Sequence, residues 1–330
     1  MKKIMFTGDR PTGKLHLGHY VGSLQNRIKL QNEYNQYVMI ADLQALTDHA
    51  SEPELIKNSI LEVMLDYLSV GIDPKITTIL LQSKIPEISE LTMYFLNLVT
   101  WNRLKHNPTI KQEIRQKGFE ENVPAGFMIY PVSQAADIAI FKAELVPVGE
   151  DQLPMIEQTN ELVRKFNKTY NCEVLVETKA LIPTMARLPG IDGKAKMSKS
   201  LNNTIYLSDS SDSLKKKVMS MYTDPNHIKV EDPGNVENNP VFIYLDVFDE
   251  DKSKVNEMKE HYKKGGLGDI VCKKRLLEVL ENFLIPIREK RKEFEKNKKQ
   301  VLEILFEGSK KAREIARKNL REIKDTIHLY

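Results

Sequence analysis

Residues 8–19 read GDRPTGKLHLGH and decide the fold of the chain. They follow an apolar run at residues 4–6 and precede residues 20–30, whose apolar side chains recur at helical spacing. The predicted order is therefore strand, tight polar loop, helix. An α/β fold binds phosphate at such a place, because the first turn of a helix offers unpaired N–H groups and the positive end of its dipole.

Two phosphate-binding motifs compete for this loop. Gly8, Gly13 and Lys14 have the spacing of a P-loop. Leu15, however, stands where that motif needs a Ser or Thr to ligate magnesium. Pro11 also lacks an N–H group that a phosphate cradle uses. We therefore reject the P-loop.

The remaining motif is His-Leu-Gly-His at residues 16–19. Gly18 has no side chain, so a purine ring fits against the helix backbone beside it. His16 and His19 are placed to donate hydrogen bonds to phosphates. Four residues also match by chance, and a solvated loop with surface histidines is the alternative that this stretch alone leaves open.

Composition and charge limit the class of protein. At 330 residues the chain is long enough for one large and one smaller domain. Its net charge is +3, but residues 286–330 carry 14 Lys and Arg against 8 Asp and Glu, a net charge of +6. This basic tail is either an RNA-facing surface or an ordinary solvated helical one.

The two cysteines and the apolar runs exclude further classes. Cys172 and Cys272 lie a hundred residues apart without a Cys-x-x-Cys pattern or a nearby His pair, so neither a zinc site nor a disulfide framework is indicated. No stretch approaches the ~20 apolar residues of a membrane span. The first six residues lack the apolar core of a signal peptide. We therefore expect a soluble cytoplasmic protein without a membrane partner.

The first part of the chain alternates strands and helices. Residues 37–41 and 77–81 are apolar runs of strand length, and residues 52–70 form an amphipathic helix that Gly71 ends. Polar residues 42–44 follow the first of these runs, as at a ligand crevice. This order predicts right-handed parallel crossovers and hence an α/β fold with a Rossmann-like, doubly wound parallel sheet.

Residues 85–130 interrupt this alternation with a helical insertion. Apolar side chains crowd a helix at residues 91–101, either because the helix is buried or because part of it contacts a second subunit. A cationic patch at residues 105–117 follows. The patch is either a surface for triphosphate or tRNA or simply solvated.

Two later segments place polar groups where a ligand is expected. Residues 130–137 open a helix in which Asp137 lies among Ala and Ile, so its carboxylate needs a partner. A short strand at residues 145–148 leads into Gly-Glu-Asp-Gln at residues 149–152, which begin another helix. The hydroxyls of a ribose find partners at such a position.

From Leu188 the sequence loosens into a loop with Lys-Met-Ser-Lys-Ser at residues 196–200. Two lysines on a mobile loop can close over a polyphosphate and neutralise charge on the departing group. A basic surface loop is the alternative. The histidine motif near residue 16 and the lysine motif near residue 196 stand at opposite ends of one α/β domain, which favours the nucleotide-binding interpretation.

Beyond residue 205 only helical spacing persists. After a glycine-rich stretch at residues 265–268, Asp269 is predicted to be the N-cap of a helix. We expect a Rossmann-like catalytic domain at residues 1–204, with the helical insertion at about 85–130, and an all-helical domain at residues 205–330.

The two motifs resemble the paired signatures of class I aminoacyl-tRNA synthetases, with Leu17 in place of Ile in His-Ile-Gly-His. Together with residues 8–13, 130–137 and 149–152 they make the whole chain similar to bacterial tryptophanyl-tRNA synthetases. The resemblance implies activation of L-tryptophan by ATP to tryptophanyl-adenylate, with release of pyrophosphate, and transfer of the tryptophanyl group to tRNA(Trp). It also implies Mg²⁺ held mainly by ATP, no metal ligand from the protein, a homodimer, and binding of tRNA and its anticodon by residues 205–330.

The resemblance also assigns site residues. It implies catalytic roles for His16, His19, Lys196 and Lys199. It implies ATP binding by Arg10, Pro11, Thr12, Gly18, His19, Gly149, Glu150, Asp151, Leu188, Lys196, Met197, Ser198, Lys199 and Ser200. It implies tryptophan binding by Gly8, Gln44, Tyr130, Gln134, Asp137 and Gln152, with Asp137 accepting the indole N–H. Gln44 and Gln134 depart from the His and Met that the best-known bacterial members often carry.

Three other functions remain open at this point. A tyrosyl-tRNA synthetase is the nearest, because a phenol also pairs with an Asp. A small-molecule nucleotidylyltransferase shares the histidine signature but normally has a much shorter chain without the helical tail. A catalytically silent, synthetase-like RNA-binding protein keeps the fold, although the intact lysine motif argues against it.

Overall fold

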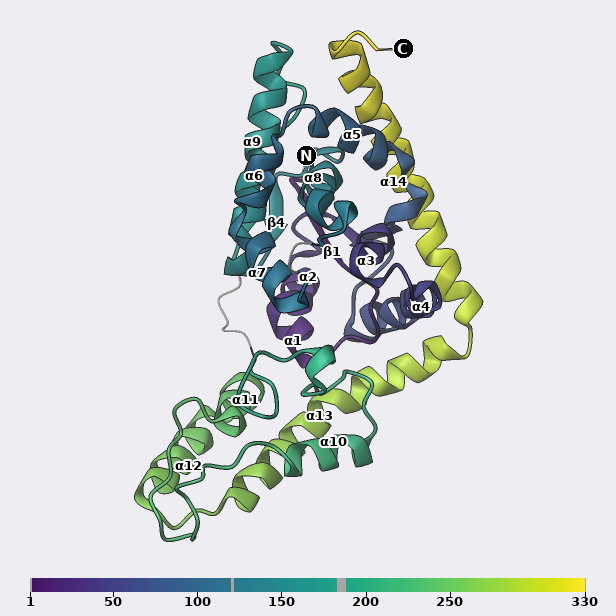
Figure 1. The fold of residues 1–330 in the computed structure, drawn as a ribbon. Helices are drawn as coiled ribbons and strands as arrows, with labels where there is room; N and C mark the ends of the chain where they lie inside the picture. Colours follow the sequence, from purple (N-terminus) through teal and green to yellow (C-terminus); the bar gives the residue numbers. More distant parts are fainter. Residues whose placement is uncertain (1, 120–121, 183–187, 330) are drawn as a thin grey trace. The chain divides into compact units, whose positions relative to one another are not determined.

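The computed structural model describes residues 2–119, 122–182 and 188–329, and the chain divides into two compact units. The sheet unit consists of Met1–Gly13, Gln25–Thr184 and Asn297–Tyr330. The helical unit consists of Lys14–Leu24 and Met185–Lys296. Figure 1 shows the elements of each unit. These bounds differ from the domains expected at 1–204 and 205–330, because the chain crosses between the units four times after its first strand.

The sheet unit contains a five-stranded parallel sheet in the order β3-β2-β1-β4-β5. The strands are β1 (Ile4–Asp9), β2 (Asn35–Ile40), β3 (Thr77–Leu81), β4 (Leu145–Pro147) and β5 (Lys179–Leu181). The chain builds outward from β1 to β3 and then returns to the other side of β1, which confirms the Rossmann-like fold. The sequence did not predict β5, because three residues carry too little alternation to read as a strand.

The register sets the position of the functional loops. Asp9 pairs with Ile40, and Ile40 pairs with Leu81, so the carboxyl ends of β1, β2 and β3 are level. The residues that follow these strands therefore share one edge of the sheet. This edge, next to the point where the strand order reverses, is where such folds bind ligands.

Nine helices surround the sheet in the described part of this unit. They are α2 (Gln25–Leu30), α3 (Asp42–His49), α4 (Pro53–Val70), α5 (Pro86–Leu96), α6 (Trp101–Lys105), α7 (Pro108–Lys117), α8 (Ala125–Ala139), α9 (Leu153–Thr169) and α14 (Lys298–Thr326). Short 3₁₀ turns, η2 (Gln82–Lys84) and η3 (Glu150–Gln152), precede α5 and α9. Within these described elements, as in the helical unit, no helix is long and apolar enough to cross a membrane.

Two predicted helices have different bounds in the structure. The single helix expected across residues 91–101 is two helices, because α5 ends at Leu96 and the Thr100 hydroxyl caps α6 by accepting from the Arg103 N–H at 3.2 Å. Helix α8 begins at Ala125 rather than at Tyr130. By contrast, Gly71 ends α4 as predicted, with a φ of 105° that glycine tolerates best.

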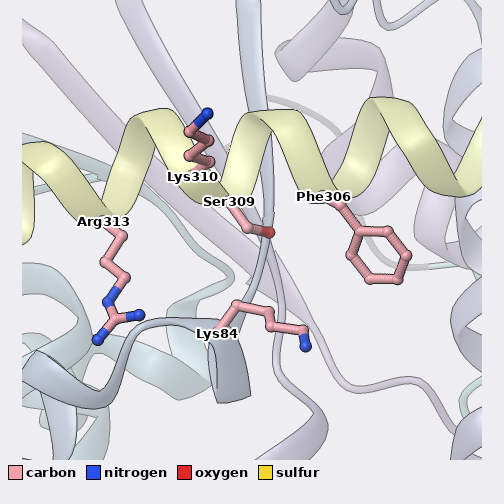
Figure 2. Close-up of a pocket in the computed structure, with 5 residues that line it drawn as sticks. All are labelled: Lys84, Phe306, Ser309, Lys310 and Arg313. Atoms are coloured by element: carbon pink, nitrogen blue, oxygen red, sulfur yellow. The ribbon is translucent and has the colours of Figure 1, made fainter.

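The last helix, α14, covers the edge strand β3 (Figure 2). Gly308 permits this approach, because a Cβ atom there would lie 2.0 Å from the Ile79 carbonyl oxygen. The Ser309 hydroxyl accepts a hydrogen bond from the Leu81 N–H at 2.9 Å, and the Lys84 amine lies 5.6 Å from the Phe306 ring centre. The contact satisfies a backbone group at an edge that would otherwise be exposed.

The helical unit contains the short helix α1 (Leu17–His19), the π-helical turn η1 (Tyr20–Leu24) and the 3₁₀ turn η4 (Lys199–Leu201). It also contains α10 (Ser211–Met219), α11 (Pro240–Phe248), α12 (Lys252–Lys264) and α13 (Asp269–Glu295). The single helix expected after the histidine motif is thus broken into α1, η1 and α2. The prediction that Asp269 is an N-cap was wrong: Gly268 is the N-cap, and Asp269 accepts from the Tyr262 hydroxyl at 2.9 Å.

Candidate active site

The histidine motif forms a tight turn in the helical unit. His16 is the N-cap of α1, and its N–H donates to Nδ1 of His19 at 3.2 Å. The two imidazole rings lie 3.8 Å apart. The backbone at residues 15–17 also pairs with residues 205–207 through N–H···O bonds of 2.9 and 3.0 Å. The turn is therefore fixed before any ligand binds.

Gly18 brings the two motifs together. Its N–H donates to the sulfur of Met197, in the lysine motif, at 3.4 Å. A Cβ atom at Gly18 would lie 2.9 Å from the His16 ring and 3.5 Å from the Met197 Cβ. A side chain at this position would therefore displace the His16 ring, whereas its contact with Met197 would have ordinary van der Waals length.

The lysine loop, residues 188–203, folds back on itself. The Met197 N–H donates to the Leu188 carbonyl at 3.3 Å, and the Met197 side chain is buried. Lys196 is exposed, and Lys199 is half-buried at the start of η4. Ser200 belongs to the same turn, but its side chain lies outside the described part of the structure. The Met anchors the loop while the Lys196 side chain reaches solvent.

Asn203 fixes this loop, and the sequence did not reveal that role. Its side chain is 2% exposed. The Oδ1 atom accepts from the Ser198 N–H at 2.8 Å, and Nδ2 donates to the Lys196 carbonyl at 3.3 Å and to Asp192 Oδ1 at 3.1 Å. Gly190 leaves room for it, because a Cβ there would lie 2.0 Å from Nδ2.

In the sheet unit, an ion pair holds the loop after β1. The Arg10 guanidinium donates to Asp48 Oδ2 at 3.1 Å, and Lys117 binds the same oxygen. Burial favours the neutral carboxyl, but Arg10 and Lys117 outweigh it and lower the pKa of Asp48. Pro11 is buried, and the Thr12 N–H donates to the Arg10 carbonyl at 2.9 Å. An anion that binds Arg10 therefore competes with Asp48.

A buried network lies beside this loop. Asp9, the last residue of β1, accepts from Arg27 and from the Tyr67 hydroxyl, both at 2.6 Å. Arg27 is 1% exposed, so its charge is balanced by Asp9 rather than by a ligand. Gly8 has a structural reason to be glycine, because a Cβ there would lie 2.7 Å from the Met39 carbonyl.

The segment after β4 forms the turn η3. The Gly149 carbonyl accepts from the Gln152 N–H at 2.9 Å, and the Asp151 carbonyl accepts from the Thr109 hydroxyl at 3.0 Å. Gln152 Nε2 donates to Asp151 Oδ2 at 3.4 Å. Glu150 is exposed. Residues 149–152, which we expect to bind the ribose, therefore lie together on one short turn.

Tyr130, Gln134 and Asp137 lie at i, i+4 and i+7 of α8 and therefore on one face of that helix. The Tyr130 hydroxyl donates to Glu113 Oε2 at 2.8 Å. Burial and the charge of Glu113 raise the pKa of Tyr130, so its hydroxyl stays protonated at neutral pH. Gln134 is half-buried.

Asp137 has the partners that its burial requires. It is 1% exposed, and its two oxygens accept from Gln82 Nε2 at 2.9 and 3.1 Å. Gln44 Nε2 donates to Oδ2 at 2.6 Å. Burial raises the pKa of Asp137 to about 8, although the Gln82 hydrogen bond opposes the rise, and Asp42 adds to it.

Sequence reasoning missed Gln82, although the necessary signal was present. Gln82 follows β3 directly, as residues 42–44 follow β2, and both positions lie at the carboxyl edge of the sheet. The same argument that drew attention to Gln44 therefore applies to Gln82.

Comparison with known proteins shows the family of the chain. Residues 2–285 match the family of tRNA synthetases class I (W and Y). The tryptophan–tRNA ligase of Clostridium longisporum is 64% identical over 330 residues, which cover 99% of this chain and 97% of that protein. The tryptophan–tRNA ligase of Streptococcus pyogenes is 61% identical over 333 residues, with coverage of 99% and 98%.

A solved structure has the same fold over the whole chain. Tryptophanyl-tRNA synthetase from Campylobacter jejuni, complexed with ADP and tryptophan, superposes with a TM-score of 0.86 at 32% identity. The match covers 99% of this chain and 100% of that one. With the histidine turn against the lysine motif, and with these similarities over the full length, the chain belongs to the class I tRNA synthetases of the W and Y family.

Proposed function

We propose that this chain is a tryptophan–tRNA ligase, which activates L-tryptophan with ATP and then transfers the tryptophanyl group to tRNA(Trp). The observation that carries the proposal is the contact between Gly18 and Met197, because it brings the histidine turn and the lysine loop together in one unit. The whole-length similarity to tryptophan–tRNA ligases favours tryptophan over tyrosine as the substrate.

In the first step, a carboxylate oxygen of tryptophan attacks the α-phosphorus of ATP, and the bond to pyrophosphate breaks. No protein nucleophile is needed, so catalysis consists of positioning and charge stabilisation; orientation supplies ~7–11 kcal/mol in favourable cases. We assign His16 and His19 to the phosphates, Gly18 to the adenine, and Lys196 and Lys199 to the departing pyrophosphate.

The remaining groups of the nucleotide have assigned partners as well. We assign the ribose to Asp151 and the backbone of Gly149, and the α-phosphate or the substrate carboxylate to Arg10. Mg²⁺ enters with the ATP phosphates. Among the described residues no group of three or more His, Cys, Asp or Glu side chains is placed to hold a metal ion.

Recognition of the amino acid depends on Asp137. An indole N–H is only a donor, so a buried carboxylate acceptor selects it and is left without that partner when phenylalanine binds. Tyr130 and Gln152 carry polar groups that suit the ammonium and carboxylate of the amino acid. Gln44 contacts Asp137, and Gln134 shares its helix face.

In the second step, a hydroxyl of the terminal ribose of tRNA attacks the carbonyl carbon of the adenylate, and AMP leaves. The basic tail, residues 286–330, supplies positive charge for the tRNA backbone. Met93 and Trp101 expose 59% and 56% of their surfaces, and these large apolar side chains support a homodimer. We place the enzyme in the cytoplasm, where ATP and tRNA meet.

The proposal is tested by single-turnover assays with the purified chain. Rapid mixing with ATP and tryptophan should give a burst of tryptophanyl-adenylate, and addition of tRNA(Trp) transcript should convert it to tryptophanyl-tRNA. A chain that binds tRNA but gives no burst would be the silent RNA-binding protein instead. A burst with tyrosine alone would identify a tyrosyl-tRNA synthetase.

A further inference from the structure

Gln82 is the most fully buried polar side chain around Asp137. It is 0% exposed and stands at the end of β3, whereas Asp137 belongs to α8 and Gln44 to α3. Its Nε2 atom lies 2.9 Å from Oδ1 and 3.1 Å from Oδ2 of Asp137. A single amide therefore bridges both oxygens of the carboxylate.

The backbone fixes the orientation of this amide. Gln82 Oε1 accepts from the Gln44 N–H at 3.1 Å. Since that N–H is only a donor, the oxygen of the Gln82 amide must face α3, and its nitrogen must face Asp137. Gln82 cannot turn its oxygen toward Asp137 without leaving the Gln44 N–H unpaired, which costs more than a hydrogen bond contributes.

The carboxylate has one acceptor position left. An ionised carboxyl group has about four lone-pair sites. Oδ2 accepts from Gln44 and Gln82, and Oδ1 accepts from Gln82 alone. The free position is therefore on Oδ1. A protonated Asp137 would place an O–H among these N–H donors, so the arrangement favours the ionised acceptor.

We propose that Gln82 is the residue that sets the specificity of the amino-acid pocket, because its fixed amide directs only N–H at Asp137 and so favours the acceptor-only carboxylate, with Oδ1 left for one aromatic ring N–H. The inference rests on the proposed function and deepens it. Gln82 acts through Asp137 and is a positioning residue. A ring without a donor leaves Oδ1 unpaired.

Other titratable groups near Asp137 also affect the pH dependence of tryptophan binding. Asp42, at the start of α3, is the acidic group that acts on Asp137, and its Oδ1 accepts from the Ser83 N–H at 2.9 Å. Tyr130, on the same helix as Asp137, is bound to Glu113 of α7. A substitution at Gln82 leaves these groups in place, so a shifted pH profile reports on Asp137.

The experiment compares Gln82→Met with Gln36→Met in the full-length enzyme. Gln36 is also 0% exposed and also donates through Nε2, to the Thr77 hydroxyl at 3.1 Å, but it lies at the opposite end of the strands. Steady-state exchange of pyrophosphate into ATP is measured from pH 6.5 to 9 with tryptophan, tyrosine and phenylalanine. Thermal unfolding of each variant establishes that it is folded.

For Gln82→Met we expect KM for tryptophan to rise at least ~10-fold at pH 7, because a hydrogen bond to a charged group is lost. The kcat should change less, and the rise in KM should become smaller toward pH 9, because the Gln82 hydrogen bond lowers the pKa of Asp137 and its loss moves the ionisation of Asp137 to higher pH. The preference for tryptophan over phenylalanine should fall by a similar factor. Gln36→Met should keep the wild-type KM and pH profile.

A KM within twofold of wild type, or a rise that is equal at every pH, would overturn the inference. If Gln82→Met does not unfold cooperatively, Gln44→Met decides, because it removes the other side-chain donor to Asp137 and keeps the backbone N–H that orients Gln82. The same pH-dependent rise in KM supports the inference, and an unchanged profile overturns it. Wild-type enzyme without tryptophan-dependent exchange would contradict the proposed function instead.

Discussion

Replacement of Asp137 by Asn tests the recognition of tryptophan most sharply. The substitution keeps the shape of the side chain, which matters because Asp137 is 1% exposed. It exchanges one acceptor oxygen for an NH₂ group and removes the negative charge. Gln82 and Gln44 together direct three donor contacts at this side chain, so at least one of them would then face a donor.

The expected loss follows from the hydrogen bond that the ligand forms. A hydrogen bond from the indole N–H to a charged group contributes ~1.5–3 kcal/mol, which corresponds to a factor of about 10 to 150 in kcat/KM. Phenylalanine has no ring N–H, so the substitution removes no hydrogen bond between phenylalanine and residue 137. We therefore expect Asp137→Asn to reduce the preference for tryptophan over phenylalanine by about 10- to 150-fold.

The pH dependence gives a second readout with a definite sign. Burial raises the pKa of Asp137 to about 8, and the indole N–H binds the ionised form. KM for tryptophan should therefore fall about 10-fold per pH unit as the pH rises from 6 toward 8, and level off above it. Asp137→Asn has no such group, so its KM should be flat over this range.

The same shift acts on stability. The folded-state pKa of Asp137 lies above the unfolded value of ~3.9, so its contribution to stability is complete below about pH 4 and is lost as the pH rises through about 8. The ligand-free wild-type protein should lose melting temperature over this interval relative to Asp137→Asn.

The assay is exchange of pyrophosphate into ATP with tryptophan, phenylalanine and tyrosine, together with thermal unfolding without ligand. Tyr130→Phe is a suitable control, because it removes a hydroxyl from the same helix face without touching Asp137. If Asp137→Asn keeps both the wild-type discrimination and the wild-type pH profile, Asp137 does not bind the indole and the reasoning is refuted.

Three further substitutions test the nucleotide side. Lys199→Ala should lower kcat of the exchange reaction by ~10²–10³-fold with little change in KM for tryptophan, because it removes stabilisation of developing charge; equal losses in both would mean that the loop shapes the ground state. Gly18→Ala should raise KM for ATP about 10-fold, since its Cβ would lie 2.9 Å from the His16 ring; an unchanged KM would remove Gly18 from the site. Asn203→Ala should lower the free energy of unfolding, measured in urea, by ~1–3 kcal/mol and should also lower kcat, because buried hydrogen bonds to the lysine loop are lost. An unchanged free energy of unfolding would contradict the structural role of Asn203.

The sequence predicted those parts of the fold that have local signals. Four of the five strands have apolar runs of strand length, and Gly71 marks the end of α4. The broken helix after the histidine turn was not predictable from spacing, because α1, η1 and α2 together keep the helical period of their apolar residues.

Contacts between distant segments left no such signal. Gly308 of α14 approaches Ile79 of β3, a pairing across more than two hundred residues that composition does not encode. The basic tail drew attention to α14 through its charge, whereas the apolar face of that helix, with Leu305 and Ala312 buried, determines where it packs. Membership of α14 in the sheet unit is therefore a tertiary effect.

The sequence indicated which residues belong to the candidate site, but it identified only some of their hydrogen-bond partners. A carboxylate among Ala and Ile predicts that Asp137 has a hydrogen-bond partner, and the structure supplies Gln44 and Gln82 from two other elements. The Lys-Met-Ser-Lys-Ser motif indicates a phosphate loop, but nothing in it identifies Asn203 as the side chain that fixes the loop. Such partners depend on the fold, which brings separate segments together.

Tryptophan-dependent exchange of labelled pyrophosphate into ATP, with the purified chain and each of the three aromatic amino acids, tests the central claim most directly. The account predicts rapid exchange with tryptophan and at least a hundredfold slower exchange with tyrosine and phenylalanine at equal concentration. Exchange supported equally well by tyrosine, or no exchange with any of the three, would contradict it.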